Sequence, residues 1–152
     1  MPSHPPAPPI AVPAPIRSDS DAVHLLTTAA TAPLEWEVLC FLLDASGRGN
    51  VVLTVSGTQH PNAVLDVVDL VARAADGTPA RYLVVASVRP DGVLEPDDDW
   101  RLHEIEQTAV EYGIDLLEWY VIGPREVVRM VQLLGEHQPC TDRWVQPWVD
   151  GE

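Results

Sequence analysis

Apolar residues follow two different spacings along the chain. Short runs rich in valine and leucine, closed by glycine, proline or aspartate, are typical of β-strands. They occupy residues 36–43, 51–55, 81–87 and 116–122. Residues 62–75 and about 97–112 instead repeat apolar side chains every three or four positions, as a helix with one buried face does. A last helix is expected at about residues 125–134, ending at Gly135.

The order of these elements predicts a single α/β domain. The run at 36–43 is apolar on both alternations, as in a central strand covered on both faces, and the run at 51–55 is expected to return beside it as an antiparallel partner. Residues 81–122 then read strand, loop, helix, strand, which is a βαβ unit. We therefore expect a mixed sheet flanked by helices. Ligand sites in such sheets lie beyond the carboxyl ends of strands, so residues 87–99 are the first candidate site.

The two ends of the chain lack this pattern. Residues 1–31 are rich in proline, alanine and serine, which predicts a disordered leader, either a plain extension or a ligand for a partner's aromatic groove. The folded domain is expected at residues 34–135. In the aromatic tail, residues 136–152, Trp144 and Trp148 either bind a partner or fold back over the domain's own sheet. Neither a secretory signal nor a membrane-spanning run is recognisable.

The formal charge of −14 limits the classes of partner. Twenty-three acids outnumber nine basic residues, all of them arginine, so binding to nucleic acid phosphates is not expected, whereas a basic protein partner is favoured. A homo-oligomer is compatible with the sequence. Cys40 and Cys140 form no C-x-x-C pair, so a thiolate zinc site is not indicated, and Cys40 is expected in the core. Together these features favour a reducing, cytoplasmic location.

Three segments around the expected site carry the framework of a known family. They read Ser-Val-Arg-Pro-Asp-Gly at 87–92, Glu-Pro-Asp-Asp-Asp-Trp at 95–100 and Ile-Asp-Leu-Leu-Glu-Trp-Tyr-Val-Ile-Gly at 114–123, with Leu-Leu-Asp at 42–44 and Ser-Gly-Thr at 56–58 upstream. This arrangement resembles the RadC-like branch of the JAB/MPN metalloprotein family, from about residue 35 to residue 123. The resemblance implies a three-layer, cytidine-deaminase-like domain.

The positions that would carry the family's chemistry are occupied by other residue types. The resemblance implies two histidines and an aspartate as zinc ligands, and here these positions hold Ser87, Arg89 and Trp100. Asp97 stands where the family motif has a serine. Arginine remains protonated and cannot coordinate a cation. The strand at 51–55, near which the general base is expected, has no glutamate. The resemblance thus implies a catalytically inactive domain without a cofactor, acting as a protein-interaction or adaptor module.

Three local expectations follow from these substitutions. Arg89 is expected to form a salt bridge with a carboxylate among residues 95–99, so that a guanidinium stands in for the lost cation. Asp97 or Asp98 is expected to cap the following helix. Trp100 is expected either to plug the former pocket or to lie on the surface of that helix.

An alternative interpretation retains a metal. His60, His103 and Asp99 lie in or near the same region, and Asp99 and His103 are four residues apart, so they can share one face of a helix. With another carboxylate they would form a rearranged zinc site, and the chain would be a metal-dependent hydrolase acting on peptide or isopeptide bonds. The sequence leaves the enzymatic status open and favours the non-catalytic interpretation.

Overall fold

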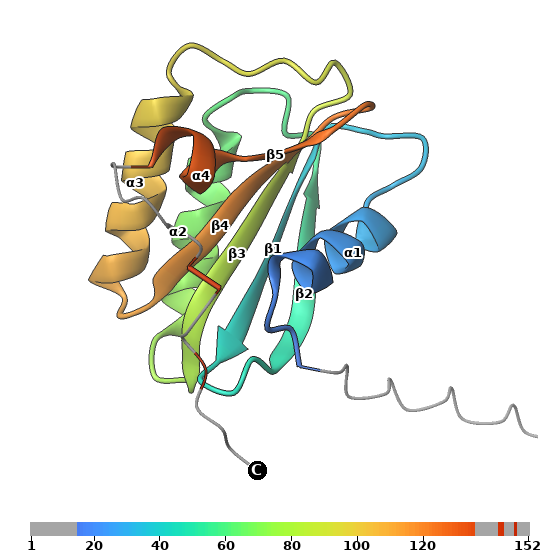
Figure 1. Cartoon of the computed structure of the whole chain (residues 1–152). Helices are drawn as coiled ribbons and strands as arrows, with labels where there is room; N and C mark the ends of the chain where they lie inside the picture. Colours follow the sequence, from blue (N-terminus) through green and yellow to red (C-terminus); the bar gives the residue numbers. More distant parts are fainter. Residues whose placement is uncertain (1–14, 136–142, 145–147, 149–152) are drawn as a thin grey trace, which may run out of the picture.

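A five-stranded mixed sheet forms the centre of the molecule in the computed structural model, which describes residues 15–135, 143–144 and 148 (Figure 1). The strands lie in the order β2-β1-β3-β4-β5. Their bounds are β1 Glu37–Asp44, β2 Gly49–Ser56, β3 Ala80–Val88, β4 Asp115–Ile122 and β5 Val127–Arg129. β1 is antiparallel to both of its neighbours, β3 and β4 are parallel, and β5 is antiparallel to β4. The expected α/β fold with a mixed sheet and the βαβ unit are therefore confirmed.

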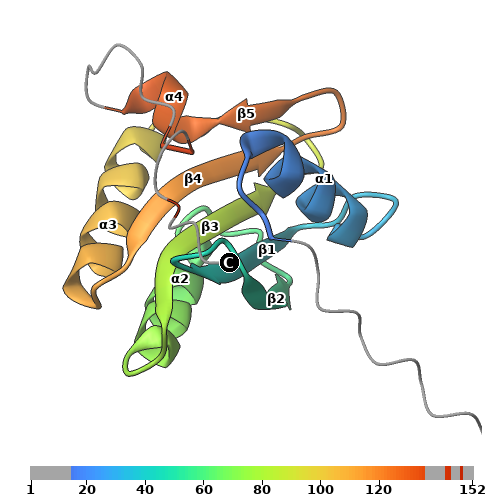
Figure 2. The same ribbon diagram turned by 60° about the horizontal axis from the view of Figure 1, so that its bottom comes forward.

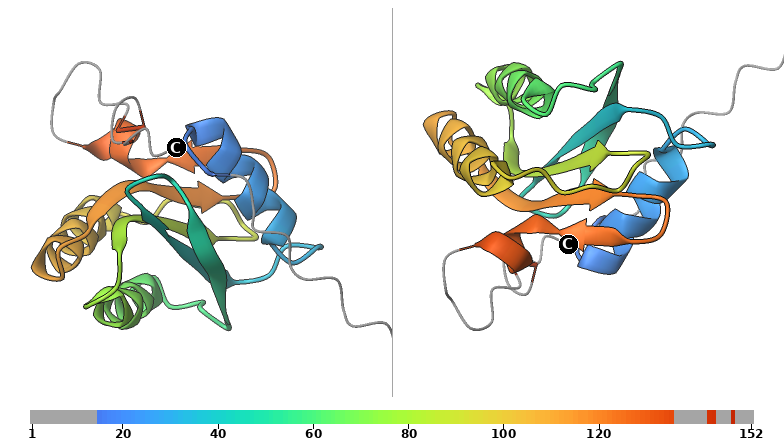
Figure 3. Two further views of the ribbon diagram at one scale, coloured as in Figure 1. Left: turned by 90° about the horizontal axis from the view of Figure 1, so that it is seen from below. Right: turned by 90° about the horizontal axis from the view of Figure 1, so that it is seen from above.

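Helices cover both faces of this sheet. α2 (Ala63–Ala75) and α3 (Asp98–Glu111) lie side by side on one face, and α1 (Asp19–Ala29) crosses the other face (Figures 2 and 3). The short helix α4 (Met130–Leu134) packs against α3 and β4. The sheet is thus the middle layer between helices.

Alternation along the central strands explains why two apolar cores form. In β1, Val38 and Cys40 point toward α2, whereas Leu39, Phe41 and Leu43 point toward α1. All five side chains are buried, as expected for a strand covered on both faces. The expected burial of Cys40 is confirmed, and burial raises the pKa of its thiol to about 12.

The expectation that the whole segment 1–31 is a disordered leader is wrong for its second half. Ser18 caps α1 by accepting a hydrogen bond from the Asp21 backbone N–H at 3.0 Å, and Ala22 and Leu26 are buried on the sheet. The backbone N–H of Ile16 donates to the Gly47 carbonyl at 2.7 Å, which attaches this segment to the β1–β2 turn. The proline-rich composition ends at Pro15, and the short helix after it has only a weak apolar pattern.

The expected helix at 125–134 is also partly wrong. Val127 and Val128 belong to β5, which pairs with the last residues of β4, and only Met130–Leu134 are helical. Adjacent β-branched residues favour a strand where a neighbouring strand edge is free to pair. The helix that follows turns the chain back toward α3.

The aromatic tail lies partly outside the described residues, but both of its tryptophans are placed. Trp144 is buried in the core on the α1 side of the sheet. Trp148 packs edge-on against Tyr82, with ring centroids 5.2 Å apart, and its indole N–H donates to the Arg17 carbonyl at 3.1 Å. This agrees with the fold-back alternative. Among the described residues, no helix is long and apolar enough to cross a membrane.

Candidate functional site at the carboxyl end of β3

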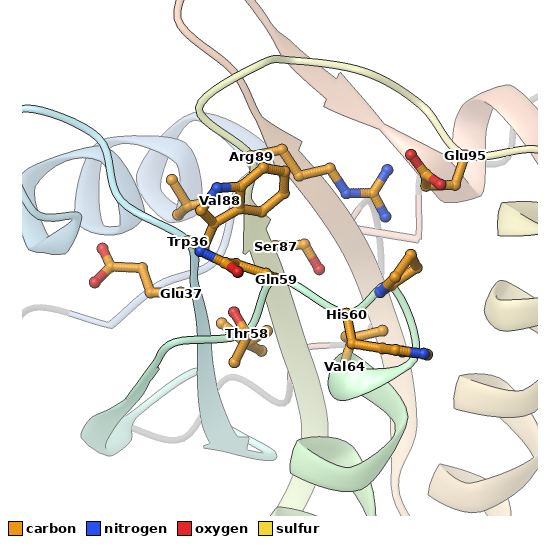
Figure 4. A pocket seen from close by; sticks show the side chains of 12 residues that line it. Trp36, Glu37, Thr58, Gln59, His60, Val64, Ser87, Val88, Arg89 and Glu95 are labelled. Carbon is orange, nitrogen blue, oxygen red and sulfur yellow. The ribbon is translucent and has the colours of Figure 1, made fainter.

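A small pocket lies where the sequence analysis placed the candidate site. Its volume is about 40 Å³, which leaves room for roughly two or three water molecules. The end of β3, the start of β1 and the loop before α2 form its walls (Figure 4). Its polar side chains are Glu37, Thr58, Gln59, His60, Ser87, Arg89 and Glu95.

Arg89 is the buried cation of this site. It follows β3 directly, and its backbone N–H donates to the Ile122 carbonyl of β4 at 2.9 Å, which fixes the backbone at this position. The guanidinium donates through Nη1 to Asp98 Oδ2 at 2.8 Å and through Nη2 to Asp98 Oδ1 at 3.1 Å. A third hydrogen bond joins Nη1 to the Val93 carbonyl at 3.0 Å. The expected salt bridge between Arg89 and an acid in 95–99 is confirmed, and the acid is Asp98.

Asp98 is held by more than one cation. Arg101, one turn further along α3, donates through Nη1 to Asp98 Oδ1 at 3.0 Å and through Nε to Asn62 Oδ1 at 2.8 Å. The Glu95 backbone N–H donates to Asp98 Oδ2 at 2.7 Å. Burial alone would raise the pKa of the Asp98 carboxyl, but these hydrogen bonds and the adjacent Arg89 charge outweigh it and hold the pKa below its usual value. Arg89, Asp98 and Arg101 thus form one buried ionic network, in which every member is less than a tenth exposed.

Trp119 of β4 contacts the same part of the site. The Arg89 guanidinium carbon lies 5.8 Å from the centre of the Trp119 ring, a cation–π distance. The Trp119 indole N–H donates to Ser87 Oγ at 3.0 Å. Ser87 and Arg89 are therefore both engaged with other protein groups.

Two glycines allow the loop between β3 and α3 to pack tightly. Gly92 has a positive φ of 67°, and a Cβ on Gly123 would lie 2.8 Å from the Gly92 Cα. Only residues without a side chain permit this approach of the two loops. Inside the loop, the Gly92 backbone N–H donates to the Arg89 carbonyl at 2.8 Å, and the Val93 backbone N–H donates to Asp91 Oδ1 at 3.0 Å. The loop is thus fixed by its own hydrogen bonds as well as by Arg89.

Asp97 and Trp100 lie outside the buried network. Asp97 is the residue before the first turn of α3, but its side chain makes no capping hydrogen bond. The Asp98 carboxylate, expected as the alternative cap, instead accepts from the Glu95 backbone N–H before the helix. Trp100 is 49% exposed, so it occupies the helix surface and does not plug the pocket.

The alternative metal set is not brought together. His60 lines the pocket, and its Nδ1 accepts a hydrogen bond from the Asn62 backbone N–H at 3.0 Å. His103 and Asp99 are exposed on α3 and do not line the pocket. In the part of the chain that the structure describes, no three His, Cys, Asp or Glu side chains are grouped so as to hold a metal ion.

Glu37 is a pocket residue that the sequence analysis did not single out. It is the first residue of β1, lies opposite Val88 of β3, and is 1% exposed. Its two carboxylate oxygens accept from the Thr31 backbone N–H at 2.7 Å and from Thr31 Oγ1 at 2.9 Å. No glutamate lies on the strand 51–55, and Glu37, on the adjacent strand, directs its carboxylate to Thr31. Its position immediately before the apolar run 38–43 was the available signal.

Glu118 is a second buried carboxylate that the sequence analysis did not single out. The β3–β4 register shifts by one residue before Glu118, and its Oε1 accepts from the backbone N–H groups of Trp119, at 2.9 Å, and of Val131, at 2.5 Å, in the first turn of α4. Burial raises the pKa of the Glu118 carboxyl to about 7 despite these hydrogen bonds. Glu118 does not line the pocket, and its hydrogen bond from Val131 indicates a structural role in holding α4.

Comparison with models of known protein families gives no match, and comparison with characterised proteins also gives none.

Proposed function

We propose that this chain is a JAB/MPN-type domain of the RadC-like branch that lacks a catalytic metal centre and serves as a protein-interaction or adaptor module. The buried network of Arg89, Asp98 and Arg101 is the observation that carries the proposal. It occupies the end of β3 at which the sequence resemblance would place a zinc ion. A permanent positive charge held by a carboxylate there disfavours a second cation.

The chemistry of the available side chains supports the same interpretation. A catalytic zinc ion needs about three side chains with free lone pairs and one open position. Arg89 has no lone pair to offer, and Ser87 Oγ already accepts a hydrogen bond from Trp119. Glu37 uses both of its oxygens to bind Thr31. The residues present therefore do not fit a zinc ion, and we derive no hydrolytic step.

Exposed apolar side chains next to the buried network support an interaction role. Val93 and Leu94 in the loop and Trp100 at the start of α3 are exposed by 49%, 39% and 49%, respectively. Because the buried network fixes the loop beneath them, a partner would lose little conformational freedom on binding. Exposed apolar and aromatic side chains on a fixed backbone are typical of protein-interaction sites.

Metal content tests the non-catalytic part of the proposal. Untagged, chelator-washed protein is analysed for zinc and then titrated with zinc while the melting temperature is followed. We expect far less than one zinc per chain and an unchanged melting temperature. Near-stoichiometric zinc that raises the melting temperature, and loses this effect in His60→Ala or His103→Ala, would contradict the proposal. A true site would give a clear signal, since a ligand at a hundred times its dissociation constant stabilises a protein by about 2.7 kcal/mol.

Surface variants test the interaction part. Leu94→Ser with Trp100→Ser removes two exposed apolar side chains next to the buried network. Leu70→Ser with Val110→Ser is the matched control, since these side chains are 59% and 62% exposed on α2 and α3. A partner captured by the wild-type chain, identified and purified, should bind the control variant normally and the first variant at least tenfold more weakly. Equal binding to both variants would place the interaction elsewhere.

A further inference from the structure

In the part of the chain that the structure describes, the sheet ends at β2 and no strand pairs with its outer edge. β2 pairs only with β1, and none of the described residues adds a strand on its other side. Figure 3 shows β2 as the outermost strand, away from β5 at the opposite edge. At eight residues, β2 presents a long row of backbone N–H and carbonyl groups, whereas β5 has only three residues.

Proteins usually protect such an edge, and the protection on β2 is limited to one register irregularity between Gly49 and Val52, near the start of the strand. A charged residue, a proline or an inward-pointing polar group commonly prevents another strand from pairing. The sequence of β2, Gly-Asn-Val-Val-Leu-Thr-Val-Ser, has neither a charge nor a proline and is rich in residues that favour strands. Leu53 at its middle is 37% exposed. The strand is therefore suited to pair with another strand.

The distribution of charge along the chain indicates which strand can pair with β2. The chain carries 23 acidic residues, yet none of them lies between Ala45 and Leu65, the stretch that contains β2. Arg48 is the single Asp, Glu, Lys or Arg in this stretch. Two copies with a charge of −14 each repel one another over most of their surface, but not along this edge. An antiparallel edge is also complementary to itself, so a two-fold axis can place the same strand on both sides of one interface.

We propose that β2 pairs with β2 of a second copy of this chain, antiparallel and about a two-fold axis, so that the two sheets become one continuous sheet. The backbone hydrogen bonds of the new strand pair satisfy the open edge of each copy. The exposed Leu53 side chains pack close to the axis, because Leu53 lies near the middle of the strand. This inference does not depend on the metal centre or on the loop that carries Trp100.

A charge exchange at the middle of β2 tests this pairing directly. One variant carries Leu53→Glu with Thr54→Glu, and the other carries Leu53→Lys with Thr54→Lys. Both positions are exposed, so each variant is expected to fold, which circular dichroism and melting curves check. The matched controls are Leu70→Glu with Val110→Glu and the corresponding lysine pair, which place the same charges on helices α2 and α3.

Mass is measured by light scattering after size exclusion over a range of concentrations. Wild type and controls should give the mass of two chains at high concentration, whereas each β2 variant alone gives the mass of one chain because like charges face each other. An equal mixture of the two β2 variants should restore the two-chain mass. The proposal is overturned by a wild type that remains a single chain, by a β2 variant that keeps the two-chain mass, or by a mixture of folded variants that stays monomeric.

Discussion

Replacing Arg89 with alanine tests the buried network most directly. The change removes two hydrogen bonds to Asp98, one to the Val93 carbonyl and the contact with Trp119. Removing one member of a buried ion pair costs about 3–5 kcal/mol. Asp98 still accepts hydrogen bonds from Arg101 and from the Glu95 backbone, so we expect the low end, about 3 kcal/mol. A domain of this size loses roughly 4 °C per kcal/mol, which predicts a fall in melting temperature of about 12 °C.

The same hydrogen bonds predict how the losses of stability of related variants rank. Asp98→Ala should destabilise at least as much as Arg89→Ala, because it leaves two buried guanidiniums without their carboxylate. Arg101→Ala should destabilise less, since it removes one of the three side-chain hydrogen bonds to Asp98. Arg89→Met keeps much of the buried volume, so it separates the loss of packing from the loss of the ion pair. Arg73→Ala is the control, because the Arg73–Asp69 pair lies on the surface of α2 and should contribute little.

A double-mutant cycle measures the coupling free energy between Arg89 and Asp98. Chemical and thermal denaturation of the variants supply its free energies of unfolding. We expect the double variant to be more stable than the sum of the single effects predicts, by about 1–3 kcal/mol.

The pKa of Asp98 lies below its usual value, so its contribution to stability is present at neutral pH and is lost as the pH falls through the folded-state pKa, below the usual 3.8. The wild type and Asp98→Asn should therefore converge in acid. An Arg89→Ala protein that melts within a degree of wild type would refute the reasoning.

Three further perturbations have defined outcomes. The pKa of Glu118 is raised from 4.5 to about 7, so the folded state binds the proton more tightly and the wild type gains stability as the pH falls from 7 to 4.5. Urea denaturation measures the free energy of unfolding of wild type and of Glu118→Gln. The difference between the two should shift by about 3 kcal/mol in favour of wild type as the pH falls across this range, and no shift would contradict the burial of the charge. Trp144→Ala should cost up to about 3–5 kcal/mol and speed proteolysis at Arg143; unchanged cleavage would argue against the fold-back. Arg129→Met removes a partly exposed pair with Asp19 and should cost about 1 kcal/mol in thermal unfolding, and a much larger loss would mean that α1 depends on this contact.

The sequence predicted elements well where the apolar spacing was strong. The two alternations of β1 indicated burial on both faces, and its inward side chains do face separate cores. The predicted pairing of Arg89 was also confirmed, because a βαβ unit brings the end of its first strand close to the start of its helix. Both successes depend on residues that lie near one another in the sequence or in a regular motif.

The remaining features depend on contacts between distant segments. Helix α1 is stabilised by packing on the sheet and by Asp19, which accepts hydrogen bonds from Tyr120 and Arg129 about a hundred residues away. Nothing in the local sequence indicates these partners. The role of Glu118 depends on a shift in strand register, and that of Arg101 on Asn62 at the start of α2. Tertiary contacts of this kind override weak local preferences, which explains why the leader and the last helix were assigned incorrectly.

The network at the end of β3 also constrains how a metal centre could arise in this chain. Arg89→His would supply a nitrogen ligand, but it would remove the guanidinium that holds both oxygens of Asp98 and the loop at Val93. Arg101 would then be the single side-chain cation on a buried carboxylate, and Ser87 would still be engaged with Trp119. One substitution therefore loses the stability of the network without completing a ligand set. We expect Arg89→His to bind zinc no better than wild type and to melt at a lower temperature, so a zinc site can form only when several positions around the pocket change together.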